Sequence, residues 1–212
     1  MFARCCTGLI ILSLMALDFG ATLFATPNAL FPVYARDILQ VGAPGLGVLY
    51  AATSIGAILG ALGMSTLRGV RRAGLGVLIG VSVFGVATVF FAASPLLWLS
   101  AVLLAVAGIG NAISAVLRWT ISQLLTPDEL RGRVSAANSV FTLGGPRLGE
   151  FRAGVVAELF GAQASALTGG LATLLLVAGL ALVPAVRRFD LRAASEAQEA
   201  APERVGVAVA RA

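Results

Sequence analysis

Charged residues inside apolar segments are the positions where this sequence could do chemistry. Asp18 lies within an apolar run over 8–33, and Arg147, Glu150 and Glu158 interrupt a Gly- and Ala-rich run over 134–160. Charge at membrane depth is costly, so such residues commonly line an ion or substrate path. On a helix, the three residues of the second run share one stripe. The pattern predicts a polar path in which Arg147 binds an anionic group or tunes Glu150, and Glu150 or Asp18 exchanges a proton.

Each of these residues also has a purely structural interpretation. Arg147 and Glu150 are three residues apart and could form an intrahelical pair satisfied within a helix bundle. Glu158 could lie at the membrane interface. Arg118 ends an uncharged run over 96–117 and could extend its guanidinium to the inner interface. The sequence leaves both interpretations open.

The elements that position these residues are long apolar segments. Of 212 residues, 58% are hydrophobic and 12% charged, whereas a soluble domain carries about a quarter charged residues. A helix crosses the hydrocarbon core with about 20 apolar residues. The sequence therefore predicts an all-α membrane protein with one domain over 1–188 and a disordered cytoplasmic tail over 189–212. Its six transmembrane helices are expected at about residues 8–33, 44–67, 73–93, 96–125, 134–160 and 164–185.

Two local patterns refine this bundle. Pro27 and Pro32 are expected to bend or end the first helix, and residues 34–43 to form a short polar loop. The first run could also be a signal peptide, but Asp18 and the length of the run favour a retained helix. In the second helix, Ala52, Gly56 and Gly60 form a stripe of small residues that lets another helix approach closely.

Arginines at the ends of the apolar runs indicate the orientation. All 15 basic residues are Arg, and clusters at 68–72, 131–133 and 187–192 fall on every second connection. Cytoplasmic loops carry an excess of Arg, so both termini are predicted to be cytoplasmic, in a bacterial inner membrane. Topology also explains the net charge of +5 without a nucleic-acid partner, and leaves the lipid bilayer as the expected partner.

Catalysis and metal binding find no support in the residue types. The chain has no His, which removes the commonest metal ligand and general base. Cys5 and Cys6 are adjacent, and two thiols are too few for a metal site. We therefore predict no metal, no cofactor and no enzymatic activity.

The segment T-P-D-E-L-R-G-R-V-S at 126–135 is the densest in charge between apolar runs. Thr126 is expected to cap the following helix, with Pro127 at its first position and Glu129 completing a capping box. Together with A-A-N-S-V-F and with G-G-P-R-L-G at 144–149, the segment resembles the turn between helices 10 and 11 of major facilitator superfamily transporters, in the siderophore- and drug-exporter branch. The residues that carry this resemblance are Pro127, Glu129, Arg131, Gly132 and Arg133.

A second segment, G-M-S-T-L-R-G-V-R-R at 63–72, resembles the cytoplasmic loop signature of that superfamily. The matching positions are Gly63, Arg68, Arg71 and Arg72, whereas Leu67 and Val70 stand where the signature has Asp and Gly. The conformational latch that this loop implies is therefore expected to be weaker.

The resemblance implies the C-terminal six-helix half of a transporter that exports a small molecule by proton-coupled alternating access. In the family, helices 7 and 10 line the central cavity, which favours Asp18, Asn111 and Arg118 as further path residues. The transport-path candidates are therefore Asp18, Asn111, Arg118, Arg147, Glu150 and Glu158.

The family's substrate site lies between two halves, and this leaves several arrangements open. The chain could be a truncated piece of a full transporter, pair with a separately encoded second six-helix half, or form a parallel homodimer. An alternative of another class is a half-size membrane protein that pairs with or stabilises a partner and transports nothing. The sequence names no substrate.

Overall fold

The computed structural model describes residues 16, 19–24, 27–66, 73–126 and 131–182, and the regular elements within these ranges are all helical. A helical stretch over 19–24 precedes the 3₁₀ turn η1 (Pro27–Leu30), the short α2 (Phe31–Val33) and the π-helix η2 (Tyr34–Ile38). The long helices are α3 (Gly42–Thr66), α4 (Ala73–Ala93), α5 (Leu97–Leu125), α6 (Arg131–Phe160) and α7 (Ala162–Ala181).

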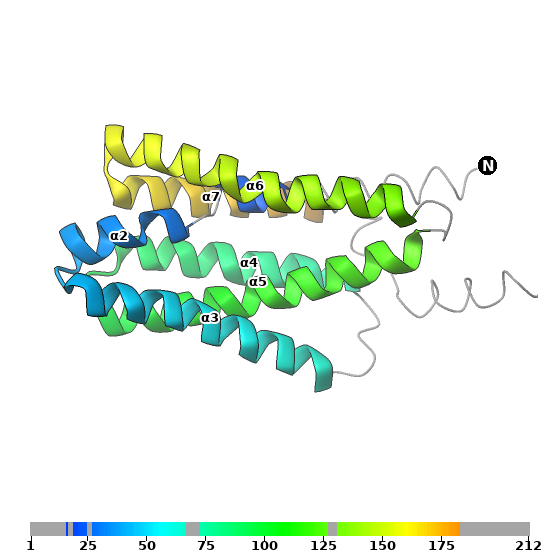
Figure 1. The fold of residues 1–212 in the computed structure, drawn as a ribbon, viewed down its shortest axis with the longest axis horizontal. Helices are drawn as coiled ribbons and strands as arrows, with labels where there is room; N and C mark the ends of the chain where they lie inside the picture. Colours follow the sequence, from blue (N-terminus) through cyan, green and yellow to red (C-terminus); the bar gives the residue numbers. More distant parts are fainter. Residues whose placement is uncertain (1–15, 17–18, 25–26, 67–72, 127–130, 183–212) are drawn as a thin grey trace, which may run out of the picture.

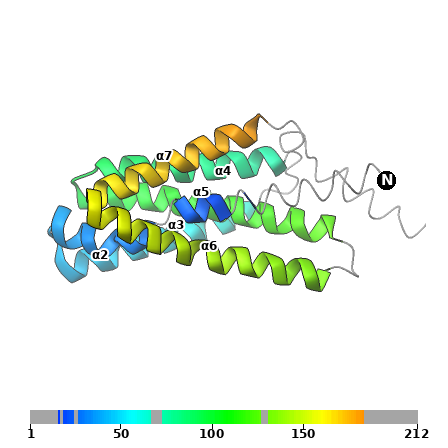
Figure 2. The ribbon, with the colours of Figure 1, turned by 90° about the horizontal axis from the view of Figure 1, so that it is seen from above.

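The long helices form one bundle along a common axis (Figure 1). η2, the start of α3, the α4–α5 turn and the α6–α7 turn lie at one end, and the other ends of these helices lie at the opposite end, so consecutive long helices run antiparallel. α5 packs against both α3 and α4, and α4 packs against α7. α6 lies at the edge of the bundle, against α7 and η1 (Figure 2).

Four of these helices are long and apolar enough to cross a membrane, within the part of the chain that the structure describes: Gly42–Ser65, Ala73–Ala93, Leu97–Leu124 and Ala162–Ala181. The predicted all-α membrane bundle is thereby confirmed. α6 has 30 residues, about 45 Å of helix at 1.5 Å per residue, but its arginines and glutamates make it more polar than the other four. Membrane crossing by α6 and by the first predicted helix stays a prediction.

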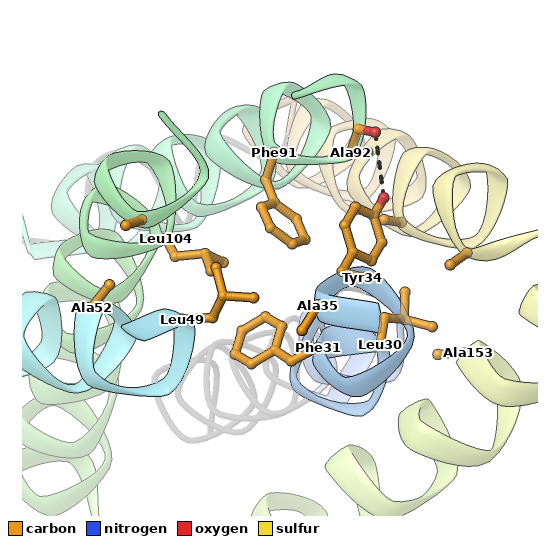
Figure 3. Close-up of a cluster of buried hydrophobic side chains, with 13 residues drawn as sticks. Leu30, Phe31, Tyr34, Ala35, Leu49, Ala52, Phe91, Ala92, Leu104 and Ala153 are labelled. Carbon is orange, nitrogen blue, oxygen red and sulfur yellow. Dashed lines mark hydrogen bonds between the residues drawn. The ribbon is translucent and has the colours of Figure 1, made fainter. Parts of the chain in front are cut away.

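The expected polar loop over 34–43 is wrong, because residues 34–38 continue as the π-helix η2. Tyr34 is fully buried. Its ring stacks on Phe91 with 4.6 Å between centroids, and its hydroxyl donates to the Ala92 carbonyl oxygen at 3.3 Å (Figure 3). Arg36 and Asp37 gave the segment its polar appearance, and they pair with each other in solvent. One buried aromatic residue thus holds in helical form a segment that reads as a loop.

The core at this end of the bundle gathers around Tyr34. The large side chains with no more than 2% of their surface exposed come from the short helices and from α3, α4 and α5 (Figure 3): Leu30, Phe31, Tyr34, Leu49, Phe91 and Leu104. Between helices in a bilayer, such side chains stabilise the bundle through close van der Waals packing. This core fixes the short helices before α3 onto the rest of the bundle.

Glycines set the closest helix crossings. A Cβ at Gly60 would lie 2.8 Å from the Ile109 carbonyl oxygen of α5, and one at Gly56 would overlap the facing backbone of α5. A Cβ at Gly80 of α4 would lie 2.7 Å from the Gly110 carbonyl oxygen of α5. The small-residue stripe predicted from Gly56 and Gly60 is confirmed as a packing surface.

The end of α5 uses Thr126 differently from the capping box expected for the next helix. Thr126 has extended backbone angles, and its hydroxyl donates to the Ser122 carbonyl oxygen at 2.6 Å. A back-bond of this kind satisfies a carbonyl at a helix C-terminus. Thr126 therefore serves the helix before it; Pro127 and Glu129 lie outside the described residues.

Candidate functional site

The ion pair predicted on α6 is present, but the described bundle does not enclose it. Arg147 Nη1 lies 3.1 Å from Glu150 Oε2, and the two side chains are 82% and 37% exposed. The adjoining face of α6 carries Ala153, which is 1% exposed and whose carbonyl accepts the Ser165 hydroxyl of α7 at 2.9 Å. The pair thus points away from the neighbours that hold α6 in the bundle.

The face of α6 around this pair combines charge with large apolar side chains. Glu158 is exposed on the same face, and Val140, Leu143 and Phe151 are 70–73% exposed. Arg147 lies about 20 Å from the C-terminal end of α6 at 1.5 Å per residue, near the middle of the helix. Lipid disfavours the charges and bulk water disfavours the apolar side chains. Such a face fits a protein surface that borders a water-filled path.

Asn111 and Arg118 lie on α5, seven residues apart, and therefore on one face of that helix. Asn111 is exposed and Arg118 is partly buried. Arg147 and Glu150, in contrast, contact each other within α6. The predicted path residues in the described chain are therefore distributed over two helices.

A small pocket with several polar residues in its lining lies between the end of α5 and the start of α6. Its volume is about 160 Å³, and it is lined by Trp119, Ser122, Gln123, Thr126, Val134, Ser135 and Asn138. Hydroxyls, amides and one indole can hydrogen-bond a neutral polar solute or water. Sequence reasoning did not find this pocket, although polar residues recur at spacings of three and four on both helices.

Arg152 is the residue whose role the sequence analysis missed. Its side chain leaves the Arg147 stripe, and its Nη2 donates to the Phe24 carbonyl oxygen at 2.7 Å. Its guanidinium carbon lies 5.5 Å from the centre of the Phe24 ring, within the range of a cation–π contact. Phe24 is distant in sequence, so no local spacing could have indicated the contact.

Several predicted residues fall outside the described part of the chain: Asp18, Arg68, Arg71, Arg72, Pro127 and Glu129. Gly63 lies near the end of α3. Arg131, Gly132 and Arg133 open α6 at that same end of the bundle (Figure 1). Among the described residues, no three His, Cys, Asp or Glu side chains gather closely enough to hold a metal ion.

Comparison with known proteins adds a family. The model of the transmembrane secretion effector family matches residues 2–211. Relatives described as the enterobactin exporter EntS occur in Escherichia coli O139:H28 (strain E24377A / ETEC), Shigella boydii serotype 18 and Escherichia fergusonii; each is 31% identical over 169 residues, which cover 79% of this chain and 40% of the relative. The chain thus spans about two-fifths of the length of these relatives. No solved structure was found to match it.

Proposed function

The chain belongs to the transmembrane secretion effector family of major facilitator superfamily transporters, in the siderophore-exporter-like branch, and from this membership we propose that it contributes one six-helix half to a proton-coupled exporter of a small molecule. The apolar helices and the family match support a multi-pass protein of a bacterial inner membrane, and we infer that it takes part in transport and not in catalysis. Secondary active export by alternating access is the mechanism that we infer for it.

The observation that carries the proposal is the exposed Arg147–Glu150 pair in the middle of α6. A helix that packs in a membrane bundle and shows an arginine on its outward face needs water or protein opposite that arginine. A transport path supplies both. In this path Arg147 binds an anionic group of the substrate, and Glu150 or Asp18 exchanges the driving proton. Asn111 and Arg118 of α5 and Glu158 of α6 complete the polar lining.

A second six-helix half covers this face in the arrangement that we propose. The half is a second copy of the chain or a separate chain, because parallel halves related by an axis along the membrane normal can build one path. The exposed apolar residues Val140, Leu143 and Phe151 around the charged pair support such a contact.

We also propose that both termini are cytoplasmic. Arg131 and Arg133 open α6 at the end of the bundle where α3 ends and α4 begins (Figure 1). Arginines concentrate on the cytoplasmic side of membrane helices, so this end is the inner one.

Transport in proteoliposomes tests the roles of the acidic residues. Enterobactin, which the relatives' name gives as their cargo, is the first substrate to offer to this chain. We expect Glu150→Gln or Asp18→Asn to abolish transport driven by an imposed proton gradient. Asp37→Asn is the matched control, since Asp37 is an exposed residue of η2 paired with Arg36. Full gradient-driven transport in both the Glu150→Gln and Asp18→Asn variants would remove these residues from the mechanism.

A further inference from the structure

The contacts of Arg152 are not explained by the proposed path. Arg152 leaves the face that carries Arg147, and its guanidinium binds the Phe24 carbonyl at 2.7 Å and stacks near the Phe24 ring. Phe24 is the last described residue of the helical stretch 19–24, and the 3₁₀ turn η1 begins at Pro27. Arg152 thus binds the chain at a carbonyl three residues before the start of η1.

The local backbone explains why a carbonyl is available there. In a 3₁₀ pattern the N–H of residue 27 would pair with the carbonyl three residues earlier, which is that of Phe24, but Pro27 has no N–H. Carbonyls at such a junction lose their α-helical donors and need others. A guanidinium supplies a charge-assisted donor, which binds more strongly than a neutral one. The Arg152 side chain therefore supplies the hydrogen-bond donor to the Phe24 carbonyl that a backbone N–H would otherwise provide.

α7 supplies the room for this contact. A Cβ at Gly169 of α7 would lie 3.0 Å from Arg152 Nη2 and would overlap the Phe24 carbonyl oxygen. One turn earlier in α7, the buried Ser165 hydroxyl binds the Ala153 carbonyl of α6 at 2.9 Å. The first helical stretch, α6 and α7 therefore meet at one point, with Arg152 between them.

Burying Arg152 costs free energy that an apolar side chain would not cost. Arg152 Nε is buried and has no hydrogen-bond partner among the described residues. A buried donor without a partner is unfavourable, and more so on a charged group. An apolar side chain at this position would fill the space without that cost. The guanidinium is therefore needed here for its hydrogen bond and not for packing alone.

We propose that Arg152 is a positioning residue: it clasps the Phe24 carbonyl and holds the following segment, residues 27–38, against α6 and α7 as one unit. Its consequence for transport rests on the proposed function, because alternating access moves rigid units against each other. With the clasp broken, the start of this segment at η1 shifts more freely against α6 and α7, while the core around Tyr34 still holds the rest of it, and the cycle slows.

Distances between spin labels test the clasp without any transport assay. The full chain, with Cys5 and Cys6 replaced by Ser, carries one label at Asn28 in η1 and one at Gln163 in α7, both exposed residues. We expect one narrow distance distribution in this background and a broad or two-peaked one after Arg152→Met. Arg147→Met, which removes an exposed arginine from the same helix, serves as the matched control and keeps the narrow distribution.

A control pair of spin labels and a second variant distinguish loss of the clasp from misfolding of the chain. Labels at Ala93 and Gln163 report the contact between α4 and α7, which does not involve Arg152, and their distance stays unchanged in a folded variant. Gly169→Ala leaves the arginine in place but wedges a methyl group into the clasp, and we expect it to broaden the Asn28–Gln163 distribution as well.

Transport supplies the second readout. In a chain that transports, each of the two variants lowers the initial rate on the order of tenfold, the effect of losing one charge-assisted hydrogen bond. A narrow Asn28–Gln163 distribution in both Arg152→Met and Gly169→Ala would overturn the clasp. A distribution that depends on Arg152 in a chain that transports nothing supports the clasp and contradicts the proposed function instead.

Discussion

Replacing Tyr34 tests whether the segment before α3 is a packed helix, as the structure has it, or the polar loop that its sequence resembles. Tyr34 is fully buried, its ring stacks on Phe91 at 4.6 Å, and its hydroxyl bonds to the Ala92 carbonyl at 3.3 Å. Truncating a buried aromatic residue to Ala costs about 3–5 kcal/mol. A long hydrogen bond inside a membrane protein contributes about 0.6 kcal/mol. Tyr34→Ala should therefore lower the free energy of unfolding by about 3–5 kcal/mol and Tyr34→Phe by under about 1 kcal/mol.

The assay is denaturant unfolding of the purified chain in mixed micelles, followed by circular dichroism. Tyr50→Ala is the matched control, because Tyr50 is 44% exposed and touches Phe31 edge-on with 5.0 Å between ring centroids; its loss is expected to be clearly smaller. The reasoning is refuted if Tyr34→Ala unfolds at the same denaturant concentration as the unmodified chain, since an exposed loop would give that result.

Three smaller predictions follow from single contacts. Gly80→Val, whose Cβ would lie 2.7 Å from a carbonyl of α5, should destabilise the bundle by roughly 1–3 kcal/mol, while Gly144→Val, which has open space, should not; equal unfolding midpoints would contradict the close crossing. Ser165→Ala removes the buried bond to α6 and should cost about 1 kcal/mol, in contrast to Ser139→Ala, whose hydroxyl is exposed on α6. Asp37→Asn breaks an exposed ion pair and should leave the unfolding midpoint unchanged at any salt concentration; a salt-dependent loss would show that the pair is shielded from water.

The sequence predicted the long helices well because their signal is local. An apolar run long enough to cross a membrane specifies its own secondary structure, and α4 spans Ala73–Ala93 as expected from composition. The glycine spacing in α3 likewise predicted a close packing surface, since residues four apart lie on the same helix face.

The misses come from contacts between residues that are distant in sequence. The sequence of η2 resembles a polar loop, but Tyr34 is buried against Phe91 and Ala92 of α4, and these contacts hold the segment in helical form. Arg152 contacts Phe24, which lies 128 residues earlier in the chain. Burial created by a partner far along the chain leaves no mark in local polarity, so periodicity alone could not indicate either contact.

In the candidate site, too, the local contact was predictable from the sequence and the surroundings of that contact were not. The spacing of Arg147 and Glu150 predicted their ion pair, because residues three apart on a helix are neighbours. The outward direction of that pair was not predictable, since charged and apolar residues share one face of α6 and give it no clear amphipathic pattern.

Accumulation of enterobactin in inside-out membrane vesicles that contain the chain is the decisive test of transport by this chain. If the chain is part of a proton-coupled exporter, an imposed proton gradient drives accumulation of the substrate inside the vesicles. A protonophore or the Glu150→Gln substitution then abolishes this accumulation. Accumulation that is no faster than in vesicles without the chain, for enterobactin and for other small molecules offered in its place, would contradict the claim that this chain transports.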